Sequence, residues 1–542
     1  MRLLQFLLFG MLLLPASLSS QTLPVGSLPD QQMRLQALLS DSSSFSVVNR
    51  PFSFSEYNAV LNNSHPDGWW NRNYAPRPLL SFGDTEAGLL PVSTLFTLNS
   101  RHPLSENNGA AWYGRGWNRE FSGGFFARGS FFSLSVQPHL VIHENRDFPA
   151  PGFVLSRSGP GFFQTEEYAA EVDLPYRFGP DPFTVLDPGH SSARLFYRAM
   201  ETGLSTEPLW WGPAVKYPLM MSNNAPGISH FFLGTRHPAP VPLIGHISFR
   251  WILGYPQDSD YYIGFNQKDR RFMNGANVAW NPSFIPELSL GVTRMFHVYE
   301  VDGFSLSNAA LILGPVRKVR LIRLEGSDEE RQERNQMISA YAHLRLPGAR
   351  AEIYGEFFRE DHSFDLRDFL QQPHHNSGYA IGLQKIMSGP GADFYNLNVE
   401  FTNLTTSQLQ QVRPQAYFYS HSRIQQGHTN RGQVLGAAIG PGSNSQYVEL
   451  QAYRERLRVG LFLQRVVNND NFHFLKGSAR LSPHREFGDF YRHRVDLNSG
   501  FSVLMVYDSL VFTGKLVWNR AYNYGRYDLA DYEGSNVTNY ER

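Results

Sequence analysis

Two adjacent tryptophans, Trp210 and Trp211, are the residues whose type and spacing most directly indicate ligand chemistry. They lie between Pro208 and the pair Gly212-Pro213. Each proline fixes φ and the glycine permits a tight reversal, so the two indole rings form a rigid aromatic platform. Such a platform could stack on sugar rings. Two structural alternatives stay open: a packed corner of the fold, and the Trp and Tyr belt where a barrel meets lipid headgroups.

A sugar site also needs planar polar groups that pair with hydroxyls, and charged partners if the polysaccharide is charged. The polar faces of the predicted strands supply such a set: Arg250, His343, Arg345, Arg350, Glu352, Tyr354, Glu356, Arg456, Arg458, Gln464, Arg494 and Asp496. From it we choose, beside the two tryptophans, the candidate polysaccharide-binding residues Arg250, Arg350, Glu352, Tyr354, Glu356 and Arg458. The alternative is the ion-paired polar lining that any large barrel lumen has.

Signatures of the common enzyme classes are missing from the sequence. It has no G-x-x-x-x-G-K-S/T loop, no H-E-x-x-H, no G-x-S-x-G and no cysteine. Ser and His are neighbours at His190-Ser191 and Ser420-His421, but neighbours along a strand point to opposite faces. His374-His375 has no carboxylate at ligand spacing. We therefore predict a protein that is not an enzyme, with no catalytic residue, metal or cofactor, and keep a barrel enzyme with a Ser-His pair as a rival.

The elements that must position these residues belong to an exported β protein. Met1-Arg2, an apolar run over 3–14 and the small residues Ser17, Ser19 and Ser20 predict a signal peptide cleaved just before Ser20 or Gln21. No later window of about eighteen apolar residues predicts a transmembrane helix. Without cysteine there is neither a lipoprotein anchor nor a disulfide. Equal numbers of Lys+Arg and Asp+Glu, 48 each, argue against a nucleic-acid partner.

From about Leu89 the apolar residues recur with a period of two, as over 132–142, 243–255, 397–401, 457–463 and 495–505. At Pro347-Gly348 the apolar parity flips across the turn, which keeps one face apolar on both strands. Short and long connections alternate, so the short ones are expected to be periplasmic. The fold class predicted is mainly β: a transmembrane antiparallel β-barrel of about 16–18 strands with short N-terminal periplasmic helices and long extracellular loops.

Three segments are predicted: a signal peptide over 1–20, a helical segment over 21–80 and the barrel with infolded loops over 81–542. Two helices are expected in the second segment, one up to Leu39 with Asp30 as N-cap, and one capped by Ser53 or Ser55. Arg294 falls on the apolar face of its strand. A β-bulge that turns Arg294 inward, or a position near the headgroups, would relieve the cost.

Several segments carry a resemblance to a known family. The Trp210-Trp211-Gly212-Pro213 core followed by Ser222-Asn223-Asn224 resembles the signature segment of the capsule assembly protein Wzi family of Gram-negative outer membranes. Three further segments are similar to that family's pattern. They are Asp173-Leu174-Pro175-Tyr176-Arg177-Phe178-Gly179, Leu346-Pro347-Gly348 with Ile353-Tyr354-Gly355, and Arg431-Gly432-Gln433-Val434-Leu435-Gly436. The resemblance runs from about residue 23 to near the C-terminus.

The resemblance implies an outer-membrane lectin-like barrel that attaches capsular or other surface polysaccharide to the cell. Its implied partners are that polysaccharide, outer-membrane lipid and, as a candidate, the capsule export machinery, and the expected state is a monomer. A rival from a different class is an outer-membrane diffusion channel, in which the polar lumen conducts small solutes.

Overall fold

The computed structural model describes most of the chain. The described residues are 22–39, 46–62, 76, 78–151, 158–165, 172–264, 270–300, 305–314, 334–360, 366–371, 373–406, 418–421, 424–471, 493–525 and 537–541. The predicted signal peptide lies outside these residues, and it stays a prediction.

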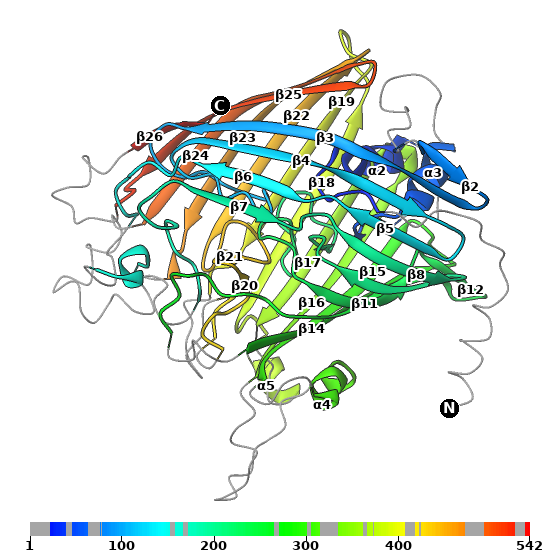
Figure 1. Ribbon diagram of the computed structural model, residues 1–542, viewed down its shortest axis with the longest axis horizontal. Coiled ribbons are helices and arrows are strands. Elements are labelled where there is room, and N and C mark those ends of the chain that lie inside the picture. The colour runs from blue at the N-terminus through cyan, green and yellow to red at the C-terminus, as the bar shows by residue number, and fades with distance from the viewer. Residues whose placement is uncertain are drawn as a thin grey trace, which may run out of the picture.

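Antiparallel strands close into a barrel (Figure 1). If β5 with β6 and β7 with β8 are each taken as one interrupted strand, eighteen strands form the wall within the described residues. These are β3 (Thr85–Asn99), β4 (Gly116–Arg128), β5 (Phe132–Val136) with β6 (His139–His143), β7 (Phe183–Asp187) with β8 (Ser192–Tyr197), β9 (Met200–Ser205), β11 (His230–Thr235), β13 (Gly245–Gly254), β14 (Arg270–Pro282), β15 (Leu288–Glu300), β16 (Arg334–Leu346), β17 (Ala351–Glu360), β18 (Ser377–Met387), β19 (Phe394–Asn403), β22 (Asn444–Arg454), β23 (Leu457–Asn468), β24 (Arg494–Tyr507), β25 (Leu510–Tyr522) and β26 (Val537–Glu541). The predicted fold class and strand number are confirmed.

The outer face of the wall is apolar and the inner face polar. Along β23, Leu461 and Leu463 are exposed outward, whereas Phe462 and Gln464, which alternate with them, are buried inward. This alternation follows from the pleat and is the pattern that lipid on one side requires. The predicted strand over 132–142 is interrupted between β5 and β6 at Gln137-Pro138, because proline cannot donate to the ladder.

Short turns gather at one end of the barrel and long connections at the other. Arg198-Ala199, Glu455-Arg456 and Asp508-Ser509 join neighbouring strands in two residues, with positive φ at the first residue of each pair. The strand ends that the connections 100–115, 144–182 and 404–443 join lie at the opposite end. Since short turns face the periplasm in such barrels, the long connections face the cell surface.

Two N-terminal helices occupy the short-turn end, as predicted. They are α2 (Leu28–Leu39) and α3 (Phe54–Asn62). Leu35 and Leu38 of α2 pack on inner-face residues at the ends of β18, β19, β22 and β24. The N-cap expected at Asp30 is wrong: Asp30 lies inside the first turn, where its backbone N–H donates to Ser27 Oγ and its carboxylate accepts from Gly26 N–H. These two hydrogen bonds place the start of helix α2 upstream of Asp30.

Ser53 caps α3, one of the two caps expected. Its Oγ accepts the Glu56 N–H at 3.3 Å, and the Glu56 carboxylate accepts the Ser53 N–H at 2.8 Å. The two bonds form a capping box, which satisfies orphan donors at the helix start.

Three inward carboxylates of β17 hold the segments that fill the lumen. Glu352 pairs with Arg34 of α2 at 2.5 Å. Glu356 accepts the Leu219 N–H at 3.1 Å, and Glu360 accepts the Tyr419 N–H. Four-residue spacing puts all three on one face of the strand. One strand therefore fastens helix α2, the connection 206–229 and the described residues of the connection 404–443, which together we call the plug.

Arg294 does face outward, but the bulge expected beside it is wrong, because β14 and β15 pair without a register shift. A segment that covers Arg294 lowers the free-energy cost of its outward position instead. Helix α4 (Leu306–Ala310) and the turn η3 (Leu311–Leu313) pack outside β14 and β15. The guanidinium donates to the carbonyls of Ile312 at 3.0 Å and Gly314 at 2.6 Å.

Candidate functional site

The tryptophan pair lies inside the plug. Trp210 and Trp211 form the two-residue strand β10 (Trp210–Trp211), which pairs with β1 (Asn49–Arg50). The Arg50 guanidinium lies 4.4 Å from the centroid of the Trp210 ring, and Trp210 Nε1 donates to the Ala214 carbonyl at 3.0 Å. Relative exposure is 5% for Trp210 and 0% for Trp211. In this conformation a polysaccharide would reach either ring only after the plug rearranged.

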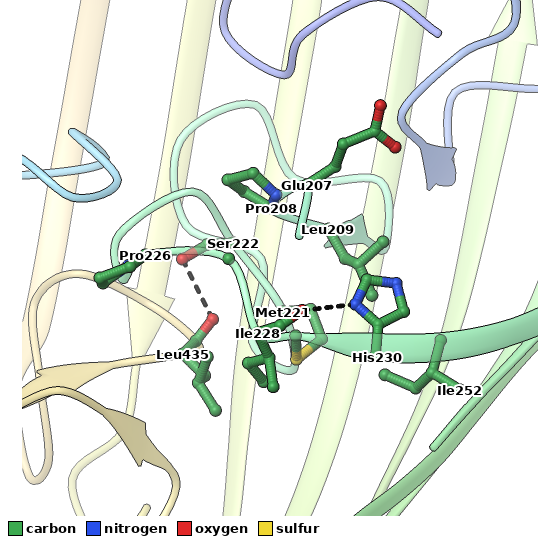
Figure 2. Close-up of a pocket in the computed structure, with 11 residues that line it drawn as sticks. Glu207, Pro208, Leu209, Met221, Ser222, Pro226, Ile228, His230, Ile252 and Leu435 are labelled. Carbon is green, nitrogen blue, oxygen red and sulfur yellow. Dashed lines mark hydrogen bonds between the residues drawn. The ribbon is translucent and has the colours of Figure 1, made fainter. Parts of the chain in front are cut away.

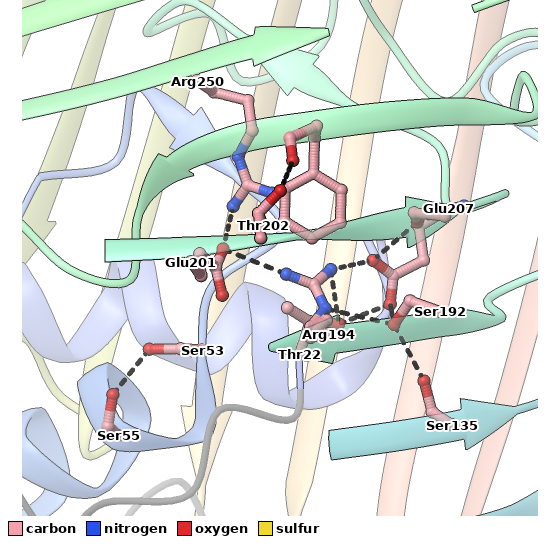
Figure 3. A network of polar contacts seen from close by, with 12 residues as sticks. Thr22, Ser53, Ser55, Ser135, Ser192, Arg194, Glu201, Thr202, Glu207 and Arg250 are labelled. Carbon is pink, nitrogen blue, oxygen red and sulfur yellow. Dashed lines mark hydrogen bonds and ion pairs between the residues drawn. The ribbon is translucent and has the colours of Figure 1, made fainter. Parts of the chain in front are cut away.

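A charge-balanced cluster lies next to the tryptophan pair, on the inner wall (Figure 3). Arg194 donates to Glu201 at 3.0 Å and to Glu207, and Arg250 donates to Glu201 at 2.6 Å. Thr22 at the start of the described chain also donates to Glu207. Burial alone would raise the pKa of Glu207, but the ion pair with Arg194 outweighs it and lowers the pKa to about 2. The carboxylate therefore stays ionised and ties the N-terminal segment to the wall.

A small cavity beside this cluster lies between the connection 206–229 and the wall strands β11 and β13 (Figure 2). It is lined by Glu207, Leu209, Met221, Ile228, His230 and other residues of the connection 206–229 and its surroundings. Its space suffices for about one water molecule. The His230 ring bonds to the Ile228 carbonyl at 2.7 Å, which fixes its orientation. A sugar ring does not fit this cavity, so it is not a polysaccharide site in this conformation.

Three of the four segments that carry the family resemblance meet inside the barrel. Ser222 donates its N–H to the Leu435 carbonyl at 2.7 Å and its Oγ–H to the Gly436 carbonyl at 2.6 Å. Asn224 donates to the Val434 carbonyl at 2.9 Å. A Cβ on Gly432 would lie 3.1 Å from the Phe178 ring, so that close approach favours glycine. Three motifs far apart in sequence thus build one packed unit.

Aromatic side chains from three surface connections gather above this unit. The Trp112 and Phe178 ring centroids are 5.0 Å apart, and Phe178 and Tyr261 are 6.1 Å apart. Phe163 lies 5.1 Å from Tyr261, and beside it Phe162 is 39% exposed. Trp112, Phe178 and Tyr261 are each partly exposed. We call these five residues the outer aromatic cluster.

Polar groups surround the outer aromatic cluster. Arg431 is one-third exposed, donates from Nε to the Gln257 side chain at 2.8 Å and pairs with Asp187 at 2.8 Å. Asp173 accepts both the N–H and the Oγ–H of Ser259 at 2.6 Å, which ties two of the connections together. Burial raises the pKa of Asp173 to about 6. Flat rings edged by planar polar groups are the combination that sugar recognition needs.

The eight residues chosen from the sequence do not form one site. Six lie in the buried lumen: Trp210, Trp211, Arg250, Glu352, Tyr354 and Glu356. The other two lie at the short-turn end, where Arg350 is exposed in a left-handed turn and Arg458 donates to Gln31 of α2 at 3.0 Å. Tyr354 donates to Glu400 at 2.6 Å, and Glu400 accepts the N–H groups of the plug residues 215–217. Their role in polysaccharide binding stays a prediction.

The outer aromatic cluster was missed because its members come from connections around 112, 162, 178 and 261 that no local pattern joins. The motif over 173–179 was the one available signal, since it contains Phe178.

Of the Ser and His neighbours that the enzyme rival needs, the Ser191 hydroxyl donates to the Pro188 carbonyl at 2.6 Å and accepts the Gln137 N–H at 3.0 Å. The buried Ser192 hydroxyl beside it bonds to Ser135 at 3.1 Å and to Glu207 at 3.3 Å. In the part of the chain that the structure describes, no group of three His, Asp or Glu side chains is arranged to hold a metal ion. No helix there is long and apolar enough to cross a membrane.

An apolar outer face, a closed antiparallel wall, short turns at one end and long connections at the other define a Gram-negative outer-membrane β-barrel. Comparison with known proteins narrows that class. The family model described as "Capsule assembly protein Wzi" matches residues 100–522, and the chain belongs to that family. No curated protein sequence matches the chain.

Among solved structures, the chain is similar to Wzi of Escherichia coli, described as an outer-membrane protein involved in group 1 capsule assembly and a carbohydrate-binding β-barrel. The TM-score is 0.60 at 13% identity, over 96% of this chain and 98% of that one. OprD of Pseudomonas aeruginosa is matched with a TM-score of 0.37 at 8% identity, over 84% and 93% of the two chains. OccAB2 of Acinetobacter baumannii is matched at 0.39 and 10%, over 84% and 96%.

Proposed function

We propose that this barrel attaches capsular or other surface polysaccharide to the cell by non-covalent binding, as a lectin rather than an enzyme. Membership of the capsule assembly family supports the biological setting. The observation that carries the binding proposal is the outer aromatic cluster, because it offers partly exposed rings at the cell-surface end. The plug residues Trp210, Trp211, Arg250, Glu352, Tyr354 and Glu356 contribute by holding the connections in place beneath it.

The surface connections give the binding a physical basis. Trp112 and Tyr261 present ring faces to sugar C–H groups, and Arg431, Gln257 and the exposed Asp260 can pair with hydroxyls. Each ring–sugar contact contributes little alone, so a long polymer that binds many copies of the barrel would be retained by avidity. Monomeric barrels and contacts with the capsule export machinery are part of the proposal.

The test compares polysaccharide in cells and in the medium for a deletion strain carrying different variants. Trp112→Ala with Tyr261→Ala should shed polysaccharide into the medium at unchanged total synthesis. A matched control is Trp117→Ala with Tyr197→Ala, which removes exposed rings from the outer wall. Retention of polysaccharide by the deletion strain itself would refute attachment. If the deletion strain sheds polysaccharide but the Trp112 and Tyr261 variant retains it, the outer aromatic cluster is not part of the binding site.

The double variant Trp210→Ala with Trp211→Ala distinguishes a role in holding the plug from direct contact with sugar. We expect shedding in this variant too, but together with lower stability of the isolated barrel. Shedding at full stability would instead place the two tryptophans in direct contact with sugar.

A further inference from the structure

Arginines gather on the outer face of four neighbouring wall strands. Strands β14, β15, β16 and β17 are described over their whole length, and each carries one outward arginine: Arg270, Arg294, Arg334 and Arg359. These directions follow from the alternation of inner-face and outer-face residues along each strand. Glu300 of β15 is the one acidic residue on the outer face of these four strands. This sector of the wall therefore carries four positive charges against one negative charge.

The four arginines lie toward the cell-surface ends of their strands. Arg270 and Arg334 are the first residues of β14 and β16, and Arg359 is the last but one residue of β17. Arg294 starts deeper on β15, but its guanidinium lies 4.7 Å from the ring centroid of Phe296, which is two positions nearer the cell surface. The opposite halves of these outer faces carry no charged side chain. Outward charges are least costly near the headgroups, which places this set in the outer leaflet of the membrane.

Two of these arginines are accessible from outside the wall. Arg270 is exposed and Arg334 is partly exposed, and within the described residues neither forms an ion pair. The Arg270 guanidinium lies 3.6 Å from the ring centroid of Tyr255, whose hydroxyl donates to Glu300 at 2.9 Å. In register, Arg270 opposes Glu300 and Arg334 opposes Val298 of the intervening strand β15. Two strand spacings and a shift of two residues separate the two arginine backbones by roughly 12 Å.

Arg294 adds positive charge from beneath the α4–η3 segment. Its side chain is 9% exposed, and the carbonyls of Ile312 and Gly314 hold its guanidinium in place. That guanidinium also lies close enough to Arg334 for the two charges to repel each other. Repulsion between two cations is offset when an anion binds beside them, because each cation then gains an attractive partner. The arrangement therefore favours an anionic headgroup over a neutral one.

The α4–η3 segment adds an apolar surface beside these charges. Asn274 of β14 donates to the carbonyls of Asn308 and Ala309 at 2.8 and 2.9 Å, which fastens α4 to the outside of the wall. Leu306 at one end of the segment and Leu313 at the other are 80% and 86% exposed. Because α4–η3 packs on the lipid side of the wall, acyl chains are the natural neighbours of these leucines. An anion-binding surface and an apolar surface therefore adjoin on one side of the barrel.

We propose that the outer face of β14–β17, with the α4–η3 segment, binds a phosphate-bearing glycolipid of the outer leaflet. Its phosphates pair with Arg270 and Arg334, and its acyl chains lie along Leu306 and Leu313. A guanidinium is suited to this role because its planar fork donates two parallel hydrogen bonds to phosphate oxygens. Two such groups on separate strands fit a headgroup that carries two phosphates. The site lies outside the barrel and does not rest on polysaccharide attachment.

The phosphate contact is tested by titrating the purified full-length barrel in detergent with diphosphoryl lipid A and counting bound lipid by native mass spectrometry. Arg270→Gln with Arg334→Gln should bind about tenfold more weakly than wild type, or worse. Arg119→Gln with Arg465→Gln removes two exposed outward arginines from β4 and β23, and this matched control should bind like wild type. Equal weakening in both double variants would reduce the effect to general charge and refute the site. Heat-modifiable migration on gels verifies that each barrel is folded.

The lipid contact is tested in the same assay. Leu306→Ala with Leu313→Ala should weaken binding of diphosphoryl lipid A, whereas Leu195→Ala with Leu204→Ala, exposed leucines elsewhere on the outer wall, should not. Unchanged binding in the first variant would contradict the placement of acyl chains on α4–η3. Lipid A without phosphates should bind wild type weakly, and equal binding of it would overturn the phosphate pairing. Complete displacement of lipid A by inorganic phosphate would show an anion site and not a lipid site.

Discussion

Two carboxylates inside the barrel, Glu207 of the plug and Glu56 of α3, have opposite protonation behaviour. Glu207 is held ionised by Arg194, whereas Glu56 in α3 lies beside the Ser53 hydroxyl and N–H. Burial raises the pKa of Glu56 to about 7, against the smaller opposite effect of the Ser53 hydrogen bonds. The fold therefore keeps the Glu207 carboxylate ionised, whereas Glu56 titrates near neutrality.

Glu56 predicts a pH dependence with a definite sign. Between pH 4.5 and about 7 the folded state holds a proton on Glu56 that the unfolded chain releases, so the free energy of unfolding falls as pH rises. Glu56→Gln keeps an acceptor for the Ser53 N–H and removes the titration. We expect the variant to lose this slope and to gain on the order of 2 kcal/mol at pH 8. Urea unfolding of the lipid-embedded barrel at several pH values measures it.

Glu86→Gln is the control, since Glu86 is more than one-third exposed in its pair with Arg128. It should leave the slope unchanged. An unchanged slope in Glu56→Gln would assign the titration to another group.

Residue-level prediction from the sequence was uneven for a physical reason. The Ser53 cap and its Glu56 partner lie three positions apart, so local spacing revealed them. The environment of Trp210 depends on Arg50 and Ala214, and that of Trp112 on Phe178. Only the closed barrel brings the partners of Trp112 together, so the aromatic residues could be counted but the outer aromatic cluster could not be located.

Strands were the elements that the sequence predicted best, because lipid on one side imposes strict alternation. Arg294 shows the limit of that pattern. Its outward direction followed from parity, but the relief comes from the α4–η3 cover, which belongs to a separate connection. The alternation of residues along a strand does not predict which other segment packs on its outer face.

Removing the α4–η3 segment should destabilise the barrel, and a second substitution, at Arg294, should restore its stability. Replacing residues 306–314 by a Gly/Ser linker uncovers Arg294 to lipid, which costs about 2–4 kcal/mol at the bilayer midplane and less near the headgroups. Arg294→Leu in the same background should recover most of that loss. Urea unfolding in lipid vesicles measures both. Val292→Leu, an uncharged change on the same face, should recover nothing, and equal recovery by it would refute the explanation.

At the level of the whole molecule, the strand pairing that closes the wall does not use the N-terminal segment 22–62. Strands β25, β26 and β3 complete the closure, and within the described residues the N-terminal segment contributes only β1, which pairs with β10 of the plug. The fold class was predictable because this wall repeats one simple pattern. The packing of the plug was not, since its contacts join residues from distant parts of the chain.

A variant lacking residues 22–62 is therefore expected to insert into the outer membrane with its strand content intact. Circular dichroism and heat-modifiable migration check this, and a lower unfolding temperature should report the lost contacts of α2. Failure to insert would show that the N-terminal segment takes part in building the wall.

The three carboxylates of β17 also have a consequence in time. Glu352 holds a residue 318 positions away, Glu356 one at 137 and Glu360 one at 59. Helix α2 leaves the export channel long before β17 exists, and its binding partner is made only when two-thirds of the chain has crossed. The helix must wait in the periplasm while the wall is assembled. Barrel assembly factors would thus bind this protein before α2 has docked in the barrel. Docking of α2 would mark the end of its biogenesis.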